Sequence, residues 1–386
     1  MRTFRAPGRA NLIGEHTDTT DGLVLPAAID RAVVLTGVPQ GRRLRLRSAQ
    51  ADGELDLAAD GSEVPPAGWG RFVAAVAAEL DALGRAPVGF TGELRSDLPQ
   101  GAGLSSSAAL EVVLTIALAD AGGLDLEPLE VAKLGRRAEH RAVGVPSGLM
   151  DQAASVLGRA DHAVLLDCAS LEHRTVPLPP DHELLVIDSG VRRQLETSGY
   201  AERTEQLRAA LPVLAGRRPA DIPLEELPTL LAGLDELPAR RLRHVVTENA
   251  RVLAAEAALL AGDLETLGAV FAAGHASLRD DFEVSVPELD TLVALAVQSG
   301  ASAARMTGGG FGGAIVVLVP AARAGQLEAE VLAGYARRHP QREATVHRCR
   351  AADGAGEAER EAEREDDVHL PEGDGLPGSN LRADLG

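Results

Sequence analysis

The pattern of hydrophobic positions divides the chain into strands and helices. Residues 43–47 alternate arginine with leucine, which predicts a half-exposed strand with the arginines on its solvated face. Helices are predicted at 72–83, 105–120 and 129–143, and short apolar runs predict buried strands at 184–187 and 315–319. The second helix carries Glu111 as its only charge before Asp120, so it should be buried on most sides. Strands and helices mix without a steady βαβ rhythm, which favours an α+β fold over a doubly wound sheet.

Proline and charge divide the chain into three parts. The proline-rich stretch 177–180 separates two structured regions, so we place an N-terminal domain at 1–180 and a C-terminal domain at 181–350. Residues 351–386 hold 11 acidic residues against three arginines, with few large apolar side chains. Such a segment cannot bury enough surface to offset its ordering entropy, and we expect an acidic disordered tail.

Composition narrows the class of protein. The 386 residues are 45% hydrophobic and carry a net charge of −19, which argues against a nucleic-acid or anionic-membrane partner. Two cysteines, Cys168 and Cys349, rule out a disulfide framework and cannot form a structural zinc site by themselves. The sequence shows no secretory signal, and its apolar runs are far shorter than the roughly 18 residues of a membrane span. We therefore expect a cytoplasmic globular protein.

A loop rich in glycine and serine, residues 98–109, leads directly into the buried helix. Gly101 and Gly103 allow the backbone to approach a ligand, and a helix start offers N–H groups and a positive dipole end to an anion. The hydroxyls of Ser105, Ser106 and Ser107 add donors and a candidate magnesium ligand. The lysine of a P-loop is absent. A serine-rich cap on a core helix explains the pattern equally well.

A second glycine cluster, residues 308–313, comes just before a predicted strand. It can serve either as a tight connection or as a place where the backbone packs closely against another group. Because it does not open a βαβ unit with the G-x-G-x-x-G spacing, a Rossmann dinucleotide site is disfavoured.

Two polar segments carry candidate chemistry. Residues 6–18 place Glu15, His16 and Asp18 where they could bracket the hydroxyls of a sugar, although turn and cap residues would give a similar pattern. A zinc site is disfavoured because H-E-x-x-H and cysteine pairs are absent. Residues 145–152 end a turn and begin a helix, so Asp151 is either a capping residue or a general base held ionised by a nearby cation.

Taken together and in this order, the segments resemble the galactokinase branch of the galacto-homoserine-mevalonate-phosphomevalonate (GHMP) kinase superfamily. The likeness runs from about residue 5 to 320. The matching motifs are the sugar signature at 8–18 and 22–26, the phosphate loop at 99–109, the catalytic-Asp motif at 148–152 and the third, glycine-rich motif at 307–313. Further matches lie at 138–140, 244–252 and 277–284.

The resemblance implies a two-domain GHMP kinase fold with the active site in the cleft between the domains. The N-terminal domain would be like domain 2 of ribosomal protein S5, and the C-terminal domain would be a ferredoxin-like α+β domain. The implied reaction is transfer of the γ-phosphoryl group of ATP to the C1 hydroxyl of α-D-galactose, the first committed step of galactose catabolism by the Leloir pathway. The implied partners are Mg²⁺ and the small molecules galactose and ATP, and we expect a monomer.

The resemblance also implies roles for individual residues. Asp151 would be the base toward the C1 hydroxyl, with Arg9 as its cationic neighbour facing the transferred phosphoryl group. The sugar would be lined by Glu15, His16, Asp18, Gly148, Asp151 and Tyr200, the nucleotide by Trp69, Gly101, Ala102, Gly103, Leu104, Ser105, Ser106 and Ser107, and the magnesium ion by Ser107 and Glu139. These roles agree with the chemistry, because phosphoryl transfer depends mainly on positioning and charge neutralisation.

The sequence departs from the family pattern at three positions. Thr19 stands where tyrosine is usual, next to the sugar loop, and leaves the sugar preference open. Ser147 and Val286 stand where cysteine is common, and we expect them to affect mainly packing.

Three alternative functions remain. The first is a kinase for a related hexose such as N-acetylgalactosamine. The second is a catalytically silent sensor of galactose and ATP, disfavoured because Asp151, Arg9, Glu139 and the serine loop are all present. The third is a mevalonate-type kinase, disfavoured because the cluster of Glu15, His16 and Asp18 suits a polyhydroxylated substrate.

Overall fold

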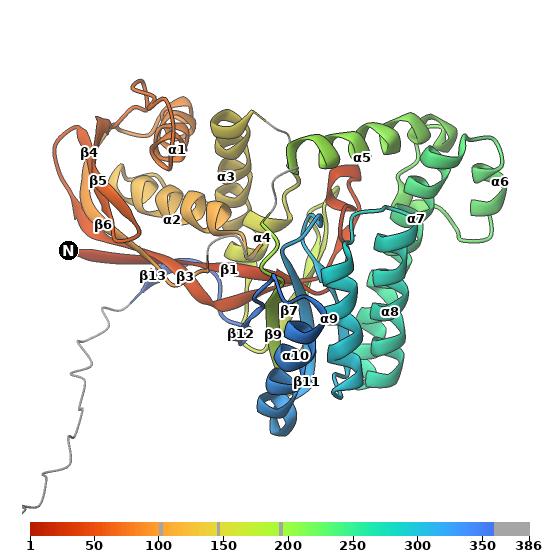
Figure 1. Cartoon of the computed structure of the whole chain (residues 1–386). Helices are drawn as coiled ribbons and strands as arrows, with labels where there is room; N and C mark the ends of the chain where they lie inside the picture. The colour runs from red at the N-terminus through yellow and green to blue at the C-terminus, as the bar shows by residue number, and fades with distance from the viewer. Residues whose placement is uncertain (100–102, 145–146, 193–195, 359–386) are drawn as a thin grey trace, which may run out of the picture.

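The structure, a computed structural model, describes residues 1–99, 103–144, 147–192 and 196–358. Figure 1 shows the first half of the chain as a sheet covered by helices and the second half as long helices beside another sheet. The α+β class predicted from the sequence is confirmed.

The largest sheet in the described part of the chain has six strands in the order β13-β1-β3-β6-β4-β5. Its strands are β1 (Arg2–Asn11), β3 (Pro26–Pro39), β4 (Arg43–Ser48), β5 (Ala51–Ala58), β6 (Phe90–Ser96) and β13 (Gly356–Ala358). The neighbours pair antiparallel except β4 and β6, which are parallel. In β4, Leu44 and Leu46 are buried while Arg45 and Arg47 are exposed, so the predicted half-exposed strand is confirmed.

Four helices belong to the same half of the chain as this sheet. They are α1 (Gly70–Ala82), α2 (Ser106–Ala121), α3 (Pro128–Val143) and α4 (Met150–Leu157). The helices predicted at 72–83, 105–120 and 129–143 are confirmed within two residues at each end. Helix α2 packs against β1 and β3 and also against α1, α3 and α4, which explains why its sequence is apolar on nearly every side.

The second sheet has the strand order β10-β11-β9-β12 and is antiparallel throughout. Its strands are β9 (His182–Asp188), β10 (Ala303–Thr307), β11 (Ala314–Pro320) and β12 (Thr345–Cys349). The first strand in the chain lies between the third and fourth, as in the ferredoxin-like arrangement. In β9, Leu184 and Val186 join one hydrophobic core while Leu185 and Ile187 join another. The sheet is therefore buried on both faces, as the predicted apolar strands require.

The remaining elements are mainly helices of the C-terminal half, together with a small three-stranded sheet. Helices α7 and α8 run side by side (Figure 1), and α7 also contacts the small sheet β2-β7-β8. Short turns interrupt the helices of residues 196–298 around positions 219–228. These elements are α5 (Glu196–Ala210), α6 (Leu227–Leu231), α7 (Glu236–Ala261), α8 (Leu264–Asp280), α9 (Pro287–Gln298), α10 (Ala324–Arg338), β2 (Leu23–Val24), β7 (His162–Asp167), β8 (His173–Pro177), and the 3₁₀ turns η1 (Asp18–Thr20), η2 (Leu211–Leu214), η3 (Pro219–Asp221) and η4 (Ala321–Arg323).

The end of the described chain returns to the first sheet. We expected all of 351–386 to be disordered, and this is wrong for its first eight residues. Ala351 forms a bridge with Ile29, and β13 pairs with β1. A strand can be added to an open sheet edge through backbone hydrogen bonds alone, so few apolar side chains are needed. Residues 359–386 lie outside the described chain, and the domain border near residue 180 stays a prediction.

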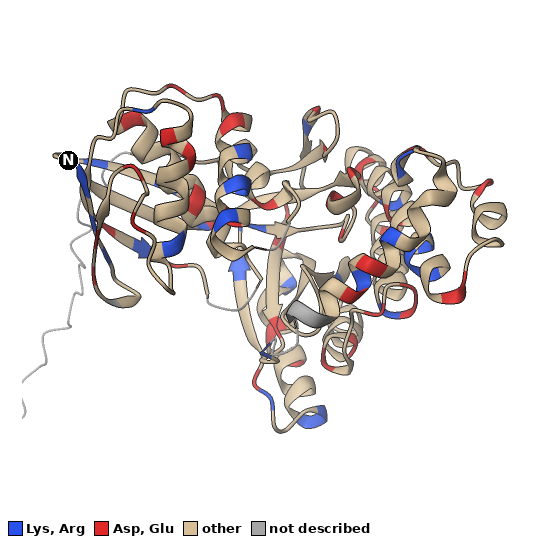
Figure 2. Ribbon diagram, turned by 90° about the horizontal axis from the view of Figure 1, so that it is seen from above, with Lys and Arg blue, Asp and Glu red and all other residues tan. Residues whose placement is uncertain are grey.

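Charge and hydropathy add two observations. Figure 2 shows acidic and basic segments interspersed over both halves of the chain. No helix within the described ranges is long and apolar enough to cross a membrane. Both cysteines are free, as expected. That the protein has no nucleic-acid partner stays a prediction.

Candidate active site

The site is centred on an ion pair between residues far apart in the sequence. Strand β1 carries Arg9, and the first turn of α4 carries Asp151. The Nε and Nη2 groups of Arg9 both lie 2.8 Å from Asp151 Oδ1. The side chain of Arg9 is 6% exposed and that of Asp151 is 31% exposed, so the carboxylate is accessible while the guanidinium is held behind it. Two donors on one carboxylate fix its position more firmly than a single contact.

The serine loop reaches the same carboxylate from a third element. Ser105 Oγ donates to Asp151 Oδ2 at 2.5 Å. Ser105 takes the left-handed conformation, with φ 59° and ψ 47°, at the residue just before α2. Arg9 also donates from Nη1 to the carbonyl oxygen of Gly103 at 2.6 Å and from its backbone N–H to the carbonyl oxygen of Leu104 at 3.2 Å. These contacts join the loop, β1 and α4 at one point.

A cavity of about 510 Å³ opens at this point. Its wall combines the first residues of α2 with backbone from the C-terminal half, so the cavity lies between the two halves. Backbone N–H groups at the start of a helix of this length attract anions, as expected for a phosphate loop. The residues lining the cavity are Arg9, Pro99, Gly103, Leu104, Ser105, Ser106, Ser107, Asp151, Arg192, Gly308 and Gly309.

The third motif serves both roles that its sequence left open. Gly308 and Gly309 line the cavity. Gly310, with φ +83°, packs so closely that a Cβ there would lie 2.4 Å from the carbonyl oxygen of Val284. The motif is thus a tight connection between β10 and β11 and also part of the cavity wall.

Several residues predicted to bind the sugar gather beside Asp151. A Cβ at Gly148 would lie 1.8 Å from Asp18 Oδ2, so these two residues are in direct contact. Burial raises the pKa of Asp18 to about 6; the charge of Asp151 raises it further and Arg9 opposes the shift. Burial also raises the pKa of the Tyr200 phenol, with smaller contributions from the charges of Asp18 and Asp151. Asp18 and Tyr200 therefore lie close enough to Asp151 to feel its charge, and Gly148 is in contact with Asp18.

His16 lies against aromatic rings, whereas Glu15 is buried in an ion pair. The ring of His16 stacks on Phe282 with centroids 4.4 Å apart and lies 5.8 Å from the ring of Tyr200. The neighbouring Glu15 is almost completely buried, and its Oε2 accepts a hydrogen bond from Arg305 Nη2 at 2.6 Å. Burial raises the pKa of Glu15 to about 7, and the charge of Arg305 opposes that shift.

The predicted magnesium ligand Glu139 is held by two side chains. Both Ser147 Oγ and Gln152 Nε2 donate to its Oε2, and the Gln152 amide also donates to Glu111 Oε2 at 2.8 Å. Burial raises the pKa of Glu111 to about 9, and the charge of Glu139 adds to the shift. The expectation that Ser147 affects mainly packing is wrong, because its hydroxyl is bonded to Glu139.

The donor groups available suit Mg²⁺. The hydroxyl of Ser107 lines the cavity, and Glu139 supplies a carboxylate, so both are hard oxygen ligands. Within the described ranges, no group of three or more His, Cys, Asp and Glu side chains could hold a metal ion. That Ser107 and Glu139 bind Mg²⁺ stays a prediction.

Some predicted residues do not line the cavity, and some lining residues were not predicted. Trp69 packs against the main core at the start of α1 and does not line the cavity, so its position near the adenine stays a prediction. Gly101 and Ala102 lie outside the described residues. Arg192, which lines the cavity, was missed, although it follows the turn that closes a predicted strand. No sequence signal indicated that Arg305 would contact Glu15.

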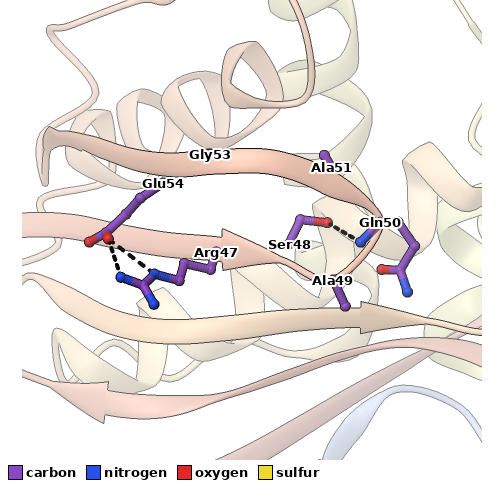
Figure 3. A pocket seen from close by; sticks show the side chains of 7 residues that line it. All are labelled: Arg47, Ser48, Ala49, Gln50, Ala51, Gly53 and Glu54. Carbon is purple, nitrogen blue, oxygen red and sulfur yellow. Dashed lines mark hydrogen bonds and ion pairs between the residues drawn. The ribbon is translucent and has the colours of Figure 1, made fainter.

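A second hollow, of about 640 Å³, lies along the β4–β5 hairpin (Figure 3). Its polar groups already have partners, since Arg47 donates to Glu54 at 2.8 Å, the Gln50 backbone N–H donates to Ser48 Oγ at 3.2 Å and the Gln50 side-chain amide donates to the carbonyl oxygen of Ser96. Arg47, Gln50 and Glu54 are exposed. Nothing in this hollow resembles the converging groups of the Arg9–Asp151 site.

Comparison with known families and structures agrees with this geometry. The galactokinase galactose-binding signature matches residues 2–39. The family descriptions for the GHMP kinases N terminal domain and the GHMP kinases C terminal match residues 71–159 and 255–337.

Similar solved structures extend over almost the whole chain. Lactococcus lactis galactokinase complexed with galactose is 32% identical, with a TM-score of 0.88 over 92% of this chain and 95% of that chain. Mevalonate kinase of Methanococcus jannaschii is 18% identical, with a TM-score of 0.65 over 91% and 98% of the two chains. L. major mevalonate kinase in complex with R-mevalonate is 20% identical, with a TM-score of 0.63 over 92% and 97%. The mevalonate kinases share the fold.

These findings define the class: the chain belongs to the GHMP kinases. Within that class it is a sugar kinase of the galactokinase family, since it carries the galactose-binding signature and matches a galactokinase over nearly its full length. The family resemblance stated from the sequence is confirmed.

Proposed function

We propose that this sugar kinase transfers the γ-phosphoryl group of ATP to the C1 hydroxyl of α-D-galactose. The observation that carries the proposal is the contact of Arg9, Asp151 and Ser105 at the wall of the cavity. Each comes from a different motif of the sequence, and together they put a carboxylate beside a place suited to phosphates. The galactose-binding signature supports the sugar assignment.

Asp151 faces the hydroxyl that attacks the phosphoryl group. Its carboxylate orients the hydroxyl and accepts its proton as the new P–O bond forms, help that is worth roughly 10²–10⁴-fold in rate. Arg9 holds the carboxylate with two N–H groups and adds positive charge next to the transferred group. Most of the remaining acceleration comes from alignment of the two substrates and from charge neutralisation.

The nucleotide phosphates occupy the 510 Å³ cavity. The start of α2 and the hydroxyls of Ser106 and Ser107 donate hydrogen bonds to them, and Arg192 approaches from the C-terminal half. The Ser105 hydroxyl donates to Asp151, so Ser105 lies beside the phosphates while it holds the carboxylate. Ser107 and Glu139 would hold Mg²⁺, which when bound neutralises phosphate charge. A P-loop lysine is unnecessary in this arrangement, because cationic side chains stand on both sides of the phosphates.

The hexose lies against the residues that gather beside Asp151. Asp18, His16 and Tyr200 offer polar groups to its hydroxyls, and Gly148 leaves room for the Asp18 side chain. Thr19 donates to the carbonyl oxygen of His16 at 3.3 Å and its side chain is exposed, so it supports the loop from outside. The acidic composition disfavours nucleic-acid and anionic-membrane partners, and the scarcity of cysteine suits the cytoplasm. That the protein is a monomer stays an expectation.

A panel of hexoses tests the proposal. Each sugar is incubated with ATP and Mg²⁺, ADP release is followed, and the position of the phosphate is determined by NMR. Galactose should give the highest kcat/KM, with phosphate on C1. A preference for N-acetylgalactosamine would change the substrate, and binding of galactose and ATP without any ADP release would make the protein a sensor. Size-exclusion chromatography should give a mass near the 40.1 kDa of one chain.

A further inference from the structure

A buried ion-pair network joins the sugar loop to the C-terminal half of the chain. Arg305, on β10, donates from Nη2 to Glu15 Oε2 at 2.6 Å and to Glu248 Oε1 at 2.7 Å. All three side chains are at most 1% exposed. Glu248, on α7, also accepts from the backbone N–H of Gly14 at 3.0 Å and from Arg251 Nε at 2.7 Å. The network therefore balances two carboxylates with two guanidinium groups.

Some polar atoms of the network have no hydrogen-bond partner in the described part of the chain. They are Glu15 Oε1, Arg305 Nε and Nη1, and Arg251 Nη2, all of them buried. The Asn11 side chain lies beside the Glu15 carboxyl and opposes the rise of its pKa. A buried polar atom without a partner is costly, and such atoms are found where a ligand or an ordered water completes the set. A sugar hydroxyl can donate to a carboxylate oxygen and accept from an N–H group, so it matches both kinds of atom.

The same two elements of the C-terminal half hold the sugar loop at other points. His244 on α7 lies with Nε2 3.2 Å from the carbonyl oxygen of Glu15, and Asn249 accepts from the Leu23 backbone N–H at 2.7 Å. Thr307 on β10 donates to the carbonyl oxygen of Asn11 at 2.9 Å. The loop that follows β1 is thus fixed by residues more than 200 positions away in the sequence.

We propose that Arg305 and Glu248 are positioning residues for sugar recognition, which fix the Glu15 carboxylate so that its Oε1 accepts a hydroxyl of the hexose. The inference rests on the proposed galactokinase function. Arg305 donates a hydrogen bond to one carboxylate oxygen of Glu15 and so determines where the other oxygen lies. Glu248 is itself held by Arg251 and by Gly14, and it keeps Arg305 in place. Neither residue lines the nucleotide cavity, so their effect falls on the sugar and leaves ATP binding unchanged.

The test compares two glutamate variants on the same helix. Glu248→Gln keeps the size of the side chain but removes its charge from the network. Glu256→Gln is the matched control, because Glu256 lies two turns further along α7, is 10% exposed and pairs with Arg174 in a bidentate contact. Galactose dissociation constants are measured by calorimetry without nucleotide, and KM values are measured for both substrates.

Glu248→Gln should weaken galactose binding by roughly 10- to 100-fold, the effect of losing a hydrogen bond to a charged group. It should leave the KM for ATP unchanged, and Glu256→Gln should leave both constants unchanged. The melting temperature of each variant shows whether it is folded at the temperature of the assay. Equal galactose affinity in the two variants would overturn the inference.

A double-mutant cycle supplies the second test and does not depend on Glu248. Arg305→Lys keeps the positive charge but loses the planar fork that divides its contacts between two carboxylates. If Arg305 acts through Glu15, adding Arg305→Lys to Glu15→Gln should cost little further galactose affinity. Fully additive losses would overturn the inference while leaving the proposed function standing. A parent protein that neither binds nor phosphorylates any hexose would overturn the proposed function itself.

Discussion

Replacing Asp151 by asparagine removes the carboxylate on which three hydrogen bonds converge. Arg9 donates two of them at 2.8 Å, and Ser105 donates the third at 2.5 Å. The amide of asparagine has nearly the same shape but cannot take the proton of the attacking hydroxyl. Loss of a general base lowers a rate by roughly 10²–10⁴-fold, and we expect kcat to fall within that range.

The effect on binding and stability should be smaller. Arg9 keeps the carbonyl oxygens of Gly103 and of the new amide as acceptors but loses its counter-charge, so the free energy of unfolding should fall by about 1–3 kcal/mol. Galactose should bind at most roughly tenfold more weakly, because the other residues beside Asp151 are unchanged.

The assay measures ADP release at saturating galactose and ATP, with galactose affinity measured separately by calorimetry. Asp167→Asn is the matched control, since Asp167 also pairs with an arginine, Arg218, at 2.8 Å but lies away from the cavity. The control should keep the kcat of the parent. A kcat of Asp151→Asn close to that of the parent would refute the role of Asp151 as base and show that alignment alone drives the reaction.

Three further outcomes can be checked with single variants. Because the folded-state pKa of Asp18 is raised from 3.8 to about 6, its ionisation opposes folding, and the parent loses stability as the pH rises between these values. In thermal denaturation, Asp18→Asn should therefore melt at a higher temperature than the parent at pH 7 and at about the same temperature at pH 3.5. An equal difference in melting temperature at both pH values would contradict the raised pKa of Asp18. Gly148→Ala forces a Cβ onto Asp18 and should raise the KM for galactose at least about tenfold, whereas Gly233→Ala, with no atom within 4 Å of the added Cβ, should not. Deleting 359–386 should leave kcat and the melting temperature unchanged, whereas deleting 351–386 should lower the melting temperature because β13 is lost; equal melting temperatures would show that β13 contributes nothing.

The periodicity of hydrophobic residues in the sequence was sufficient to predict the main helices and the buried strands. The apolar stretch after the serine loop predicts α2 because a helix surrounded by β1, β3, α1 and α3 must be apolar on nearly every side. The strand β13 could not be found in the same way. It has three residues, two of them glycine and alanine, and it is stabilised by backbone pairing with β1, which leaves no hydrophobic pattern in the sequence.

The site could be predicted only in part, for a similar reason. The types of residue at 15, 16, 18 and 151 indicated sugar and proton chemistry, but no local rule brings Arg9 to Asp151 across 142 positions. That pairing came from the family resemblance. Arg305 and Glu248 were missed because a buried ion pair carries no spacing signal; each residue alone looks like an ordinary charge on a strand or a helix.

The pairing of β13 with β1 has a consequence for how the protein folds. The register joins Thr3 to Ala358 and Arg5 to Gly356, so the strand that carries Arg9 gains its outer neighbour only after almost the entire described chain has left the ribosome. Contacts this distant in sequence slow folding. Until they form, residues 3–5 of β1 present an unpaired backbone edge, the kind of edge at which partly folded chains associate.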